Sequence, residues 1–222
     1  MAVDIRQLLL TTVEMNASDL HIVTGEPPVV RLKGEIRRLN QPALSRSEAR
    51  LLADSILTDR LRAQFAEELS VDFSFALEGK ARFRVNIFMQ SKGVSIALRR
   101  IPPTVLTLRE LDAPQVLETI AGYRRGLVLV TGPTGSGKST TLAAIIDHIN
   151  RTRKEHILTI EDPIEYVHTP RNCIINQREI GVHARSFSEA LRSALREDPD
   201  VILVGEMRDL ETISLAITAA ET

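Results

Sequence analysis

The chain has 222 residues, and its 28 Lys and Arg residues nearly balance its 29 Asp and Glu residues, which gives a formal net charge of −1. Hydrophobic residues make up 43% and charged residues 26% of the chain, so a folded core is expected and disorder as the dominant state is excluded. The neutral balance and the 4% aromatic content argue against a nucleic-acid-binding surface, and one cysteine, Cys173, excludes an internal disulfide framework or a multi-cysteine zinc site.

The chain begins with the pattern of a helix followed by short strands. Apolar residues at helical spacing predict a helix over 3–13, and a short strand is predicted over 18–23. Two further strands, at 29–32 and 36–39, flank a Lys-Gly-Glu turn and predict a hairpin.

The rest of the first half predicts one helix and three more strands. A cap at Ser45 or Ser47 opens a helix that is expected to run through Leu69. Its predicted inner face consists of Leu51, Leu52, Ile56, Leu61 and Phe65. Alternating apolar residues then predict strands over 71–77, 81–89 and 94–100. The first half is therefore predicted to be an α+β domain on an antiparallel sheet with one buried face.

A proline pair, Pro102-Pro103, interrupts these patterns, because proline disfavours helix at the preceding residue and cannot donate to a ladder. The predicted division is a domain at 1–100, a linker at 101–112 and a second domain at 113–222.

The second half alternates strand and helix, which predicts a parallel sheet and an α/β fold class. Continuous apolar runs predict buried strands at 126–131, 157–160 and 201–204. Helices are predicted over 139–150, from a capping box at Ser186 through Arg196, and from Asp209 with Leu210, Ile213 and Ile217 on one face.

No run approaches 18 apolar residues, and the first residues lack a basic start followed by a long apolar stretch. The sequence therefore predicts neither a membrane span nor a signal peptide, and a cytoplasmic setting is expected. The chain stops at Thr222 inside the last helical pattern without a cap, which predicts a truncated fragment.

A phosphate-binding loop is the strongest motif. Residues 132–139 read GPTGSGKS, which matches G-x-x-x-x-G-K-[ST] between a predicted strand and a predicted helix. In such a loop the glycines let successive N–H groups face a phosphate, Lys138 contributes a cation, and the Ser139 hydroxyl is a ligand for Mg²⁺. The alternative is a glycine-rich turn that only caps a helix. It does not account for the complete motif or for its position between a predicted strand and a predicted helix.

Two acidic segments follow predicted strands. Glu161 and Asp162 come directly after one buried strand, where either carboxylate can position or deprotonate a water; the alternative is a solvated acidic turn. Glu206 follows the run at 201–204 and predicts a Walker-B-like acid that reaches Mg²⁺. Arg208 and Asp209 are interpreted either as part of that site or as a helix-cap pair.

Arginines alternate with apolar residues on two neighbouring strands. Arg82 and Arg84 are expected on the face opposite Phe83, and Arg99 and Arg100 lie on the next strand. They form either a solvated outer face or a set that supplies an arginine in trans to the γ-phosphate of a nucleotide bound by a neighbouring subunit. The five histidines show no metal-ligand spacing and are interpreted as ordinary residues.

Longer stretches resemble a known family. They read GPTGSGKSTTLAAIIDHIN, HILTIEDPIEYVH, NQREIG and FSEALRSALREDPDVILVGEMRDLETISLAITAAET, with ASDLHIVTGEPPVVRLKGEIRRL, VDFSFALEGKARFRVNIF and RRIP in the first half. Over essentially its whole length the chain resembles the type IV pilus retraction ATPases, the PilT twitching-motility family of the secretion-superfamily ATPases.

This resemblance implies a PAS-like N-terminal domain and an incomplete RecA-like P-loop NTPase domain with a mainly parallel sheet. It implies a homo-hexamer that hydrolyses ATP with Mg²⁺ to retract pili at the inner-membrane pilus base. The implied partners are an inner-membrane pilus platform protein and paralogous retraction or extension ATPases, and no nucleic acid is expected.

The family's motifs fall on specific positions of this sequence. The implied catalytic residues are Glu161, Glu206, Arg82, Arg84 and Arg99. The implied nucleotide-binding residues are Gly132, Pro133, Thr134, Gly135, Ser136, Gly137, Lys138, Ser139 and Thr140. Ser139 and Glu206 are the expected Mg²⁺ contacts.

The chain also departs from the family, which continues after AAET with Gly-His and a histidine box. The start at the small domain and the single cysteine favour the retraction branch over extension and secretion motors. The remaining alternatives are a PilU-type accessory ATPase, a secretion or DNA-translocating ATPase of the same superfamily, and a non-catalytic fragment.

Overall fold

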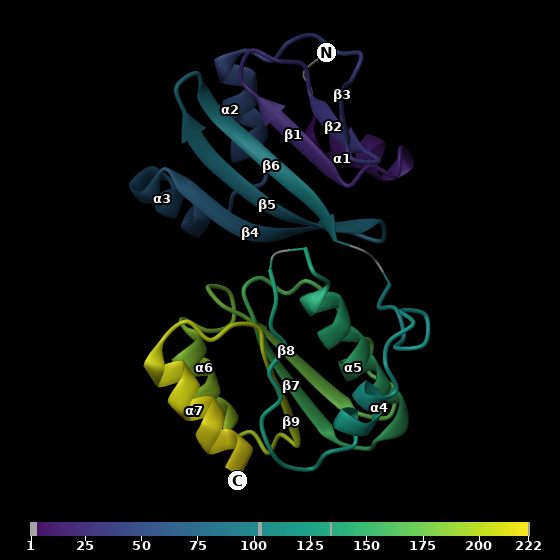
Figure 1. Ribbon diagram of the computed structural model, residues 1–222. Coiled ribbons are helices and arrows are strands. Elements are labelled where there is room, and N and C mark those ends of the chain that lie inside the picture. Colours follow the sequence, from purple (N-terminus) through teal and green to yellow (C-terminus); the bar gives the residue numbers. More distant parts are fainter. Residues whose placement is uncertain (1–3, 102–103, 134, 222) are drawn as a thin grey trace. The chain divides into compact units, whose positions relative to one another are not determined.

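The computed structural model describes residues 4–101, 104–133 and 135–221. The chain forms two compact units, residues 1–102 and residues 103–222. Of the linker predicted over 101–112, Pro102 and Pro103 lie outside the described residues, Ile101 ends a strand, and Leu108 is buried in the second unit. Each unit has its own sheet, antiparallel in the first and parallel in the second (Figure 1).

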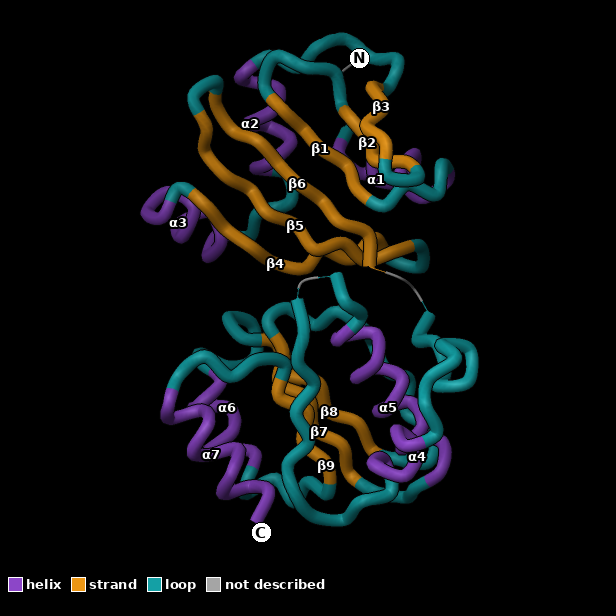
Figure 2. The backbone as a smooth tube through the Cα atoms, viewed as in Figure 1, coloured by secondary structure: helices purple, strands orange, loops and turns teal. Residues whose placement is uncertain are grey.

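Six strands form the sheet of the first unit, in the order β3-β2-β1-β6-β5-β4 (Figure 2). Their bounds are Asp19–Val23 (β1), Val29–Leu32 (β2), Glu35–Arg38 (β3), Ser70–Leu77 (β4), Ala81–Gln90 (β5) and Gly93–Ile101 (β6). The predicted hairpin and the other predicted strands are confirmed to within about two residues. Lys33 and Gly34 form the hairpin turn with φ of 51° and 87°, because a two-residue turn between twisted strands needs positive φ.

Strict alternation gives this sheet two different faces. Leu20, Leu98 and Val85 are cross-strand neighbours on β1, β6 and β5, and all three are buried. They face the core formed with α1 (Ile5–Glu14) and two further helices, which lie behind the sheet in Figure 1. The side chains that alternate with these along each strand, such as Arg84 and Arg99, lie on the opposite face, as alternation predicts.

The single helix predicted from Ser45 through Leu69 is wrong. The structure has two helices, α2 (Arg46–Asp54) and α3 (Asp59–Glu68). Ser45 caps α2 with a complete capping box, and the Thr58 side chain accepts a hydrogen bond from the N–H of Leu61 and so starts α3. The second cap competes with helix continuation, because a side-chain acceptor satisfies an N–H that an uninterrupted helix would bond internally.

The break also corrects the predicted inner face. Leu52 is 4% exposed, and Ile56, Leu61 and Phe65 are buried as predicted, whereas Leu51 is 67% exposed. With two separate helix axes, each helix orients its own stripe toward the core, and Leu51 falls on the outside of α2.

These adjacent leucines provide a matched stability test. Leu52→Ala should lower the unfolding free energy of the first unit by about 2–5 kcal/mol, the usual cost of emptying a buried leucine site. Leu51→Ala should change it by less than about 0.5 kcal/mol, as an exposed substitution does. Chemical denaturation followed by the amide NMR signals of the first unit measures both, and equal costs for the two variants would contradict the burial assigned to them.

The second unit has a three-stranded parallel sheet in the order β8-β7-β9, with bounds Ile174–Glu179 (β8), His156–Glu161 (β7) and Val201–Val204 (β9). The helices α4 (Val116–Ala121) and α5 (Lys138–Thr152) cover one face, and α6 (Phe187–Ala194) and α7 (Leu210–Glu221) cover the other (Figure 1). The strand β7 is buried on both faces as predicted: Ile157 packs toward α5, and Leu158 and Ile160 pack toward α6 and α7.

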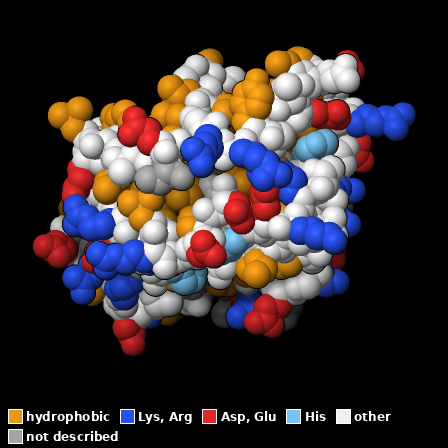
Figure 3. Space-filling model, turned by 90° about the horizontal axis from the view of Figure 1, so that it is seen from below, with side chains coloured by type: hydrophobic (Ala, Val, Ile, Leu, Met, Phe, Trp, Pro, Cys, Tyr) orange, Lys and Arg blue, Asp and Glu red, His pale blue; other side chains and the backbone are white. Residues whose placement is uncertain are grey.

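The strand predicted at 126–131 is not present. This segment has no strand structure, and Leu127, Val128 and Leu129 are 46%, 47% and 61% exposed. A strand needs a partner for its N–H and C=O groups. Within the described residues the segment pairs with neither edge of the three-stranded sheet, and the N–H of Gly126 donates instead to the carbonyl of Ala220 at 3.2 Å. Figure 3 shows one face of the molecule, on which hydrophobic side chains lie among Lys, Arg, Asp and Glu side chains.

Other parts of the second unit differ from the sequence patterns in detail. Two elements, α4 and β8, carry no clear period and were not predicted. The strand β9 is half-buried, because only β7 pairs with it in the described residues. The helix α7 buries Thr212 and Ala216 and leaves Leu210 and Ile217 exposed, so the face predicted to pack is the wrong one.

Across the described ranges, none of the helices has both the length and the apolar character that crossing a membrane requires.

Candidate functional site

The loop at 132–138 has the backbone shape that its glycines allow. Gly132 has φ of 151°, and a Cβ there would lie 2.7 Å from the Ser136 Oγ, which would have to move. Gly137 has φ of 91° and is the N-cap of α5. Both positions favour glycine because L side chains rarely adopt these positive φ values. Thr134, one of the predicted binding residues, lies outside the described residues.

The first turn of α5 is open to an anion. Gly137 has no side chain to accept from the first-turn N–H groups, and the turn contains no acidic residue. The predicted binding residues Lys138, Ser139 and Thr140 form this turn. The Lys138 Nζ donates to the carbonyls of Gly132 and Pro133 at 2.8 and 2.9 Å, which holds the ammonium over the loop. First-turn N–H groups without a side-chain cap, the positive end of the helix dipole and a cation thus meet at one place and suit a phosphate.

One contact joins this turn to the segment after β7. The hydroxyls of Thr140 and Tyr166 lie 3.1 Å apart. The three-residue connection from α5 to β7 makes β7 return alongside the helix, so that Glu161 at the end of β7 and the start of α5 lie at the same end of the unit (Figure 1). The sequence predicted both motifs separately, and the fold brings them together.

Glu161 is a half-buried carboxylate with several donors. The hydroxyl of Thr159 donates to its Oε1 at 2.6 Å, the Nε2 of Gln177 donates to the same oxygen at 3.2 Å, and the N–H of Glu165 donates to Oε2 at 3.4 Å. Burial raises the pKa of Glu161 above its ordinary value, the three hydrogen bonds oppose that rise, and the charge of Glu165 adds to it. A carboxylate with a raised pKa at the end of a buried strand is suited to take a proton from water.

Glu206 follows β9, near the end of β7. The N–H of Gly205 donates to the carbonyl of Ile160 at 2.8 Å, and a Cβ on Gly205 would lie 3.3 Å from the Cα of Glu161. Close packing at this glycine therefore sets Glu206 next to the end of β7. The Glu206 carboxylate pairs with Arg208 at 2.8 Å.

Asp209 has a structural role at the start of α7. Its carboxylate accepts the N–H and the hydroxyl of Thr212, each at 2.8 Å. These hydrogen bonds lower the pKa of Asp209. The helix-cap interpretation is thus confirmed for Asp209, whereas Arg208 pairs with Glu206.

The oxygen donors expected to contact Mg²⁺, the Ser139 hydroxyl and the Glu206 carboxylate, are of the hard type that Mg²⁺ binds together with phosphate oxygens and water. Among the described residues, no group of three or more His, Cys, Asp or Glu side chains could hold a metal ion. A Mg²⁺ ion held by these two side-chain oxygens would take its remaining ligands from phosphate and water.

The predicted arginines share the exposed face of the first unit's sheet. Arg84 on β5 is the cross-strand neighbour of Arg99 on β6. Each pairs with an acid on its far side, Arg84 with Asp72 at 2.6 Å and Arg99 with Asp19 at 3.0 Å. The acids offset the repulsion between the two opposed guanidinium groups.

Asp19 is the most buried member of this row. Burial acts to raise its pKa, but hydrogen bonds from Ser18 and Arg99 and the charge of Arg99 lower it below the ordinary value. Arg82 donates to the Ser74 hydroxyl at 3.1 Å on the same face, whereas Arg100 donates to Asn16 at 2.9 Å.

Three residues around Glu161 were missed by sequence reasoning: Thr159, Tyr166 and Gln177. Gln177 belongs to the NQREIG stretch, which carried a family resemblance but no role. Only the fold shows that its side chain reaches Glu161, because the two residues are 16 positions apart on neighbouring strands.

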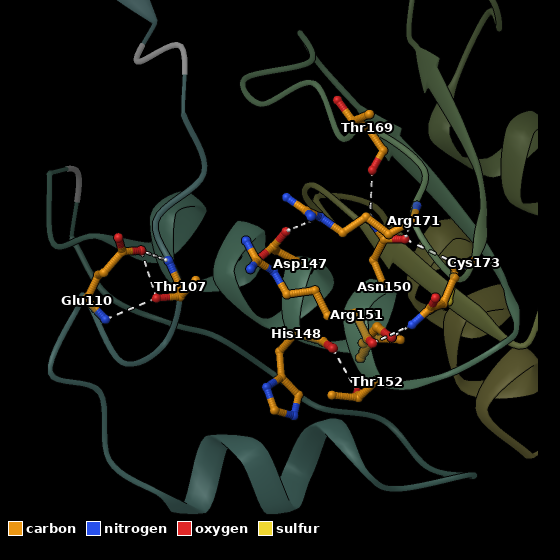
Figure 4. Close-up of polar contacts among 12 residues, drawn as sticks. Thr107, Glu110, Asp147, His148, Asn150, Arg151, Thr152, Thr169, Arg171 and Cys173 are labelled. Carbon is orange, nitrogen blue, oxygen red and sulfur yellow. Dashed lines mark hydrogen bonds and ion pairs between the residues drawn. The ribbon is translucent and has the colours of Figure 1, made fainter.

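The other end of α5 carries structural contacts (Figure 4). The Asn150 Nδ2 donates to the carbonyl of Thr169 at 2.9 Å, and its Oδ1 accepts the N–H groups of Arg171 and Cys173 at 2.9 and 3.4 Å. These bonds fix the segment that leads into β8.

A small cavity of about 90 Å³ lies at this end of the helix, away from the phosphate loop. It is lined by Thr107, Leu108, Arg109, Glu118, Ala144, Asp147, His148 and Arg151.

Comparison with known proteins gives consistent matches. The family model of the type II/IV secretion system proteins matches residues 1–222. The type IV pilus retraction ATPase PilT of Pseudomonas aeruginosa is 56% identical over 99% of this chain and 64% of its own length. A twitching motility protein of Neisseria gonorrhoeae is 53% identical over 100% of this chain and 59% of its own length. A crystal structure of the pilus retraction motor PilT with bound ADP superposes with a TM-score of 0.94 at 48% identity, covering 99% of this chain and 64% of that one. The chain thus spans about three fifths of the length of these relatives.

Proposed function

The chain belongs to the type II/IV secretion system protein family, and from that premise we propose that it forms part of an ATP-hydrolysing motor that retracts type IV pili. The proposal extends to a PAS-like fold for the first unit and an incomplete RecA-like fold for the second. The retraction ATPase PilT and the ADP-bound retraction motor, at 56% and 48% identity, support this reading over other members of the family.

The contact between Thr140 and Tyr166 is the observation that carries the proposal. It joins the first turn after the phosphate loop to the segment that follows Glu161. An ATP whose phosphates lie on the loop would then have a buried carboxylate beside the reacting end. Such an arrangement supports phosphoryl transfer to water, in which positioning and electrostatic stabilisation do most of the catalytic work.

Each residue has a proposed task. The loop N–H groups and Lys138 hold the phosphates, and Ser139 and Glu206 hold Mg²⁺, which neutralises charge on the phosphate oxygens when bound. Glu161 orients the attacking water and accepts its proton. Arg82, Arg84 and Arg99 offset negative charge on the phosphates of ATP bound by a neighbouring copy, in a homo-hexamer.

The motor is proposed to act in the cytoplasm, at the inner-membrane base of the pilus. Its proposed partners are the pilus platform protein and paralogous retraction or extension ATPases. A PilU-type accessory role, a secretion or DNA-translocating ATPase and a non-catalytic fragment are the competing functions.

Complementation tests the proposal. The encoded protein, expressed in a strain that lacks its retraction ATPases, should restore twitching motility, and the purified protein should hydrolyse ATP only when Mg²⁺ is present. Restoration only in a second strain that keeps its own main retraction motor would assign the accessory role instead. An encoded protein that neither hydrolyses ATP nor affects retraction would contradict the proposal, and salt-sensitive DNA binding near physiological ionic strength would favour a DNA-translocating function.

A further inference from the structure

The side-chain amide of Gln177 is fully used in three hydrogen bonds. Its Nε2 donates to the Oε1 of Glu161 at 3.2 Å and to the carbonyl of Tyr166 at 2.8 Å. Its Oε1 accepts the N–H of His168 at 2.8 Å. A flipped amide would oppose acceptor to acceptor at two of these contacts and donor to donor at the third, so only one orientation satisfies the site.

The sheet places this amide beside the carboxylate. Gln177 on β8 is the direct cross-strand neighbour of Thr159 on β7. Thr159 lies two residues before Glu161 on the same strand. Because side chains alternate along a strand, all three side chains lie on one face of the sheet. Thr159 and Gln177 both donate to Oε1 of Glu161. The other oxygen, Oε2, accepts only the long bond from the N–H of Glu165 among the described residues, at 3.4 Å. One carboxylate oxygen is thus held while the other keeps capacity for a proton.

The same amide ties down the segment that carries the Tyr166 hydroxyl. By bonding the carbonyl of Tyr166 and the N–H of His168, Gln177 fixes the backbone on both sides of Val167. Tyr166 in turn contacts Thr140 in the first turn of α5. Gln177 therefore contacts both the carboxylate and the loop after β7, and Tyr166 of that loop links it to the phosphate-binding turn.

We propose that Gln177 is a positioning residue for Glu161: it holds one carboxylate oxygen toward β8, so that the other faces the water that attacks ATP. This inference rests on the proposed function, because it assigns Gln177 a part in the ATP hydrolysis proposed for Glu161.

Two variants separate positioning from stability. Gln177→Met keeps the length of the side chain and removes the amide. Asn176→Ala, on the same strand, removes an exposed amide that bonds His156 at 3.0 Å and serves as the matched control. Gln177→Met should lower kcat by roughly 10- to 100-fold, the effect of losing a hydrogen bond to a charged group, with KM for ATP changed less than about twofold. Asn176→Ala should leave both constants near those of the parent.

A second readout does not depend on activity. The titration of Glu161 in the 222-residue chain is followed by its ¹³C carboxyl NMR signal, assigned by its loss in Glu161→Gln. Removing a donor to the charged form should raise the pKa of Glu161 in Gln177→Met, and the acidic limb of kcat should move to higher pH. The charged groups on the surrounding elements include Asp162 and Glu165 on the same loop, Arg178 and Glu179 on β8, Lys138 at the start of α5, and Glu206 with Arg208 after β9.

The outcomes distinguish this inference from the proposed function. An unshifted Glu161 titration in Gln177→Met, or an unchanged kcat, would overturn the positioning role even in an active ATPase. If the parent protein hydrolyses no ATP, the proposed function fails and the catalytic role of Gln177 fails with it, while the NMR titration still reports whether the amide holds the carboxylate.

Discussion

Replacement of Lys138 by alanine is expected to abolish ATP turnover by the encoded protein and, with it, twitching motility. The Lys138 ammonium donates to the carbonyls of Gly132 and Pro133, so the folded loop already holds the cation where phosphate charge would lie. Losing a charge-assisted contact of about 3 kcal/mol in the transition state lowers the rate by on the order of 100-fold, and nucleotide binding should weaken as well. Steady-state ATPase assays and a twitching assay measure the two effects.

A matched control is available on the same unit. Lys154 is exposed in the connection between α5 and β7, so Lys154→Ala removes an equal charge away from the loop and should keep turnover and motility. Normal motility in the Lys138→Ala strain would contradict the proposed function, because no other residue of the loop supplies a cation.

Replacement of Glu161 by glutamine is expected to separate ATP binding from hydrolysis. The variant keeps the phosphate loop and should bind ATP with near-parent affinity. It lacks the carboxylate that accepts a proton from water, and losing a general base costs roughly 10²- to 10⁴-fold in rate. Equilibrium binding of a fluorescent ATP analogue and single-turnover hydrolysis measure the two properties separately.

The same variant should be more stable than the parent at neutral pH. Burial raises the pKa of Glu161, so the folded state holds its proton more tightly than the unfolded state. Ionisation of Glu161 therefore costs folding free energy, a cost that is absent below the unfolded-state pKa and develops as pH rises through the folded-state pKa. Glutamine carries no charge, so Glu161→Gln should have a higher Tm near neutral pH, and the difference should close as the solution is acidified.

Glu211→Gln is the control for hydrolysis. Glu211 is a surface carboxylate of the same unit, paired with Arg192, and its loss should leave turnover near that of the parent. Unchanged turnover in Glu161→Gln would remove its catalytic assignment, and a lower Tm than the parent at neutral pH would show that its hydrogen bonds outweigh the cost of its buried charge.

Local patterns were sufficient for the elements whose stability is decided nearby. The hairpin at β2 and β3, the alternating strands β4 to β6, the helix α5 and the buried strand β7 follow from turn residues and hydrophobic period. The phosphate loop is also local, because glycines, lysine and the helix start occupy consecutive positions. For the same reason Lys138 and Ser139 could be assigned to this loop from the sequence, and their role in phosphate binding stays a prediction.

The sequence alone determined the period of most strands and helices, the position of the phosphate loop and the presence of carboxylates after β7 and β9. The tertiary structure decided the features that need a partner far along the chain. The apolar run at 126–131 has strand composition but no neighbouring strand among the described residues, so it lies exposed. The bond from Gln177 to Glu161 depends on the register of two neighbouring strands. A hydrogen bond or a buried contact needs two partners, which can lie far apart in the chain. A local sequence pattern identifies one partner but not the other.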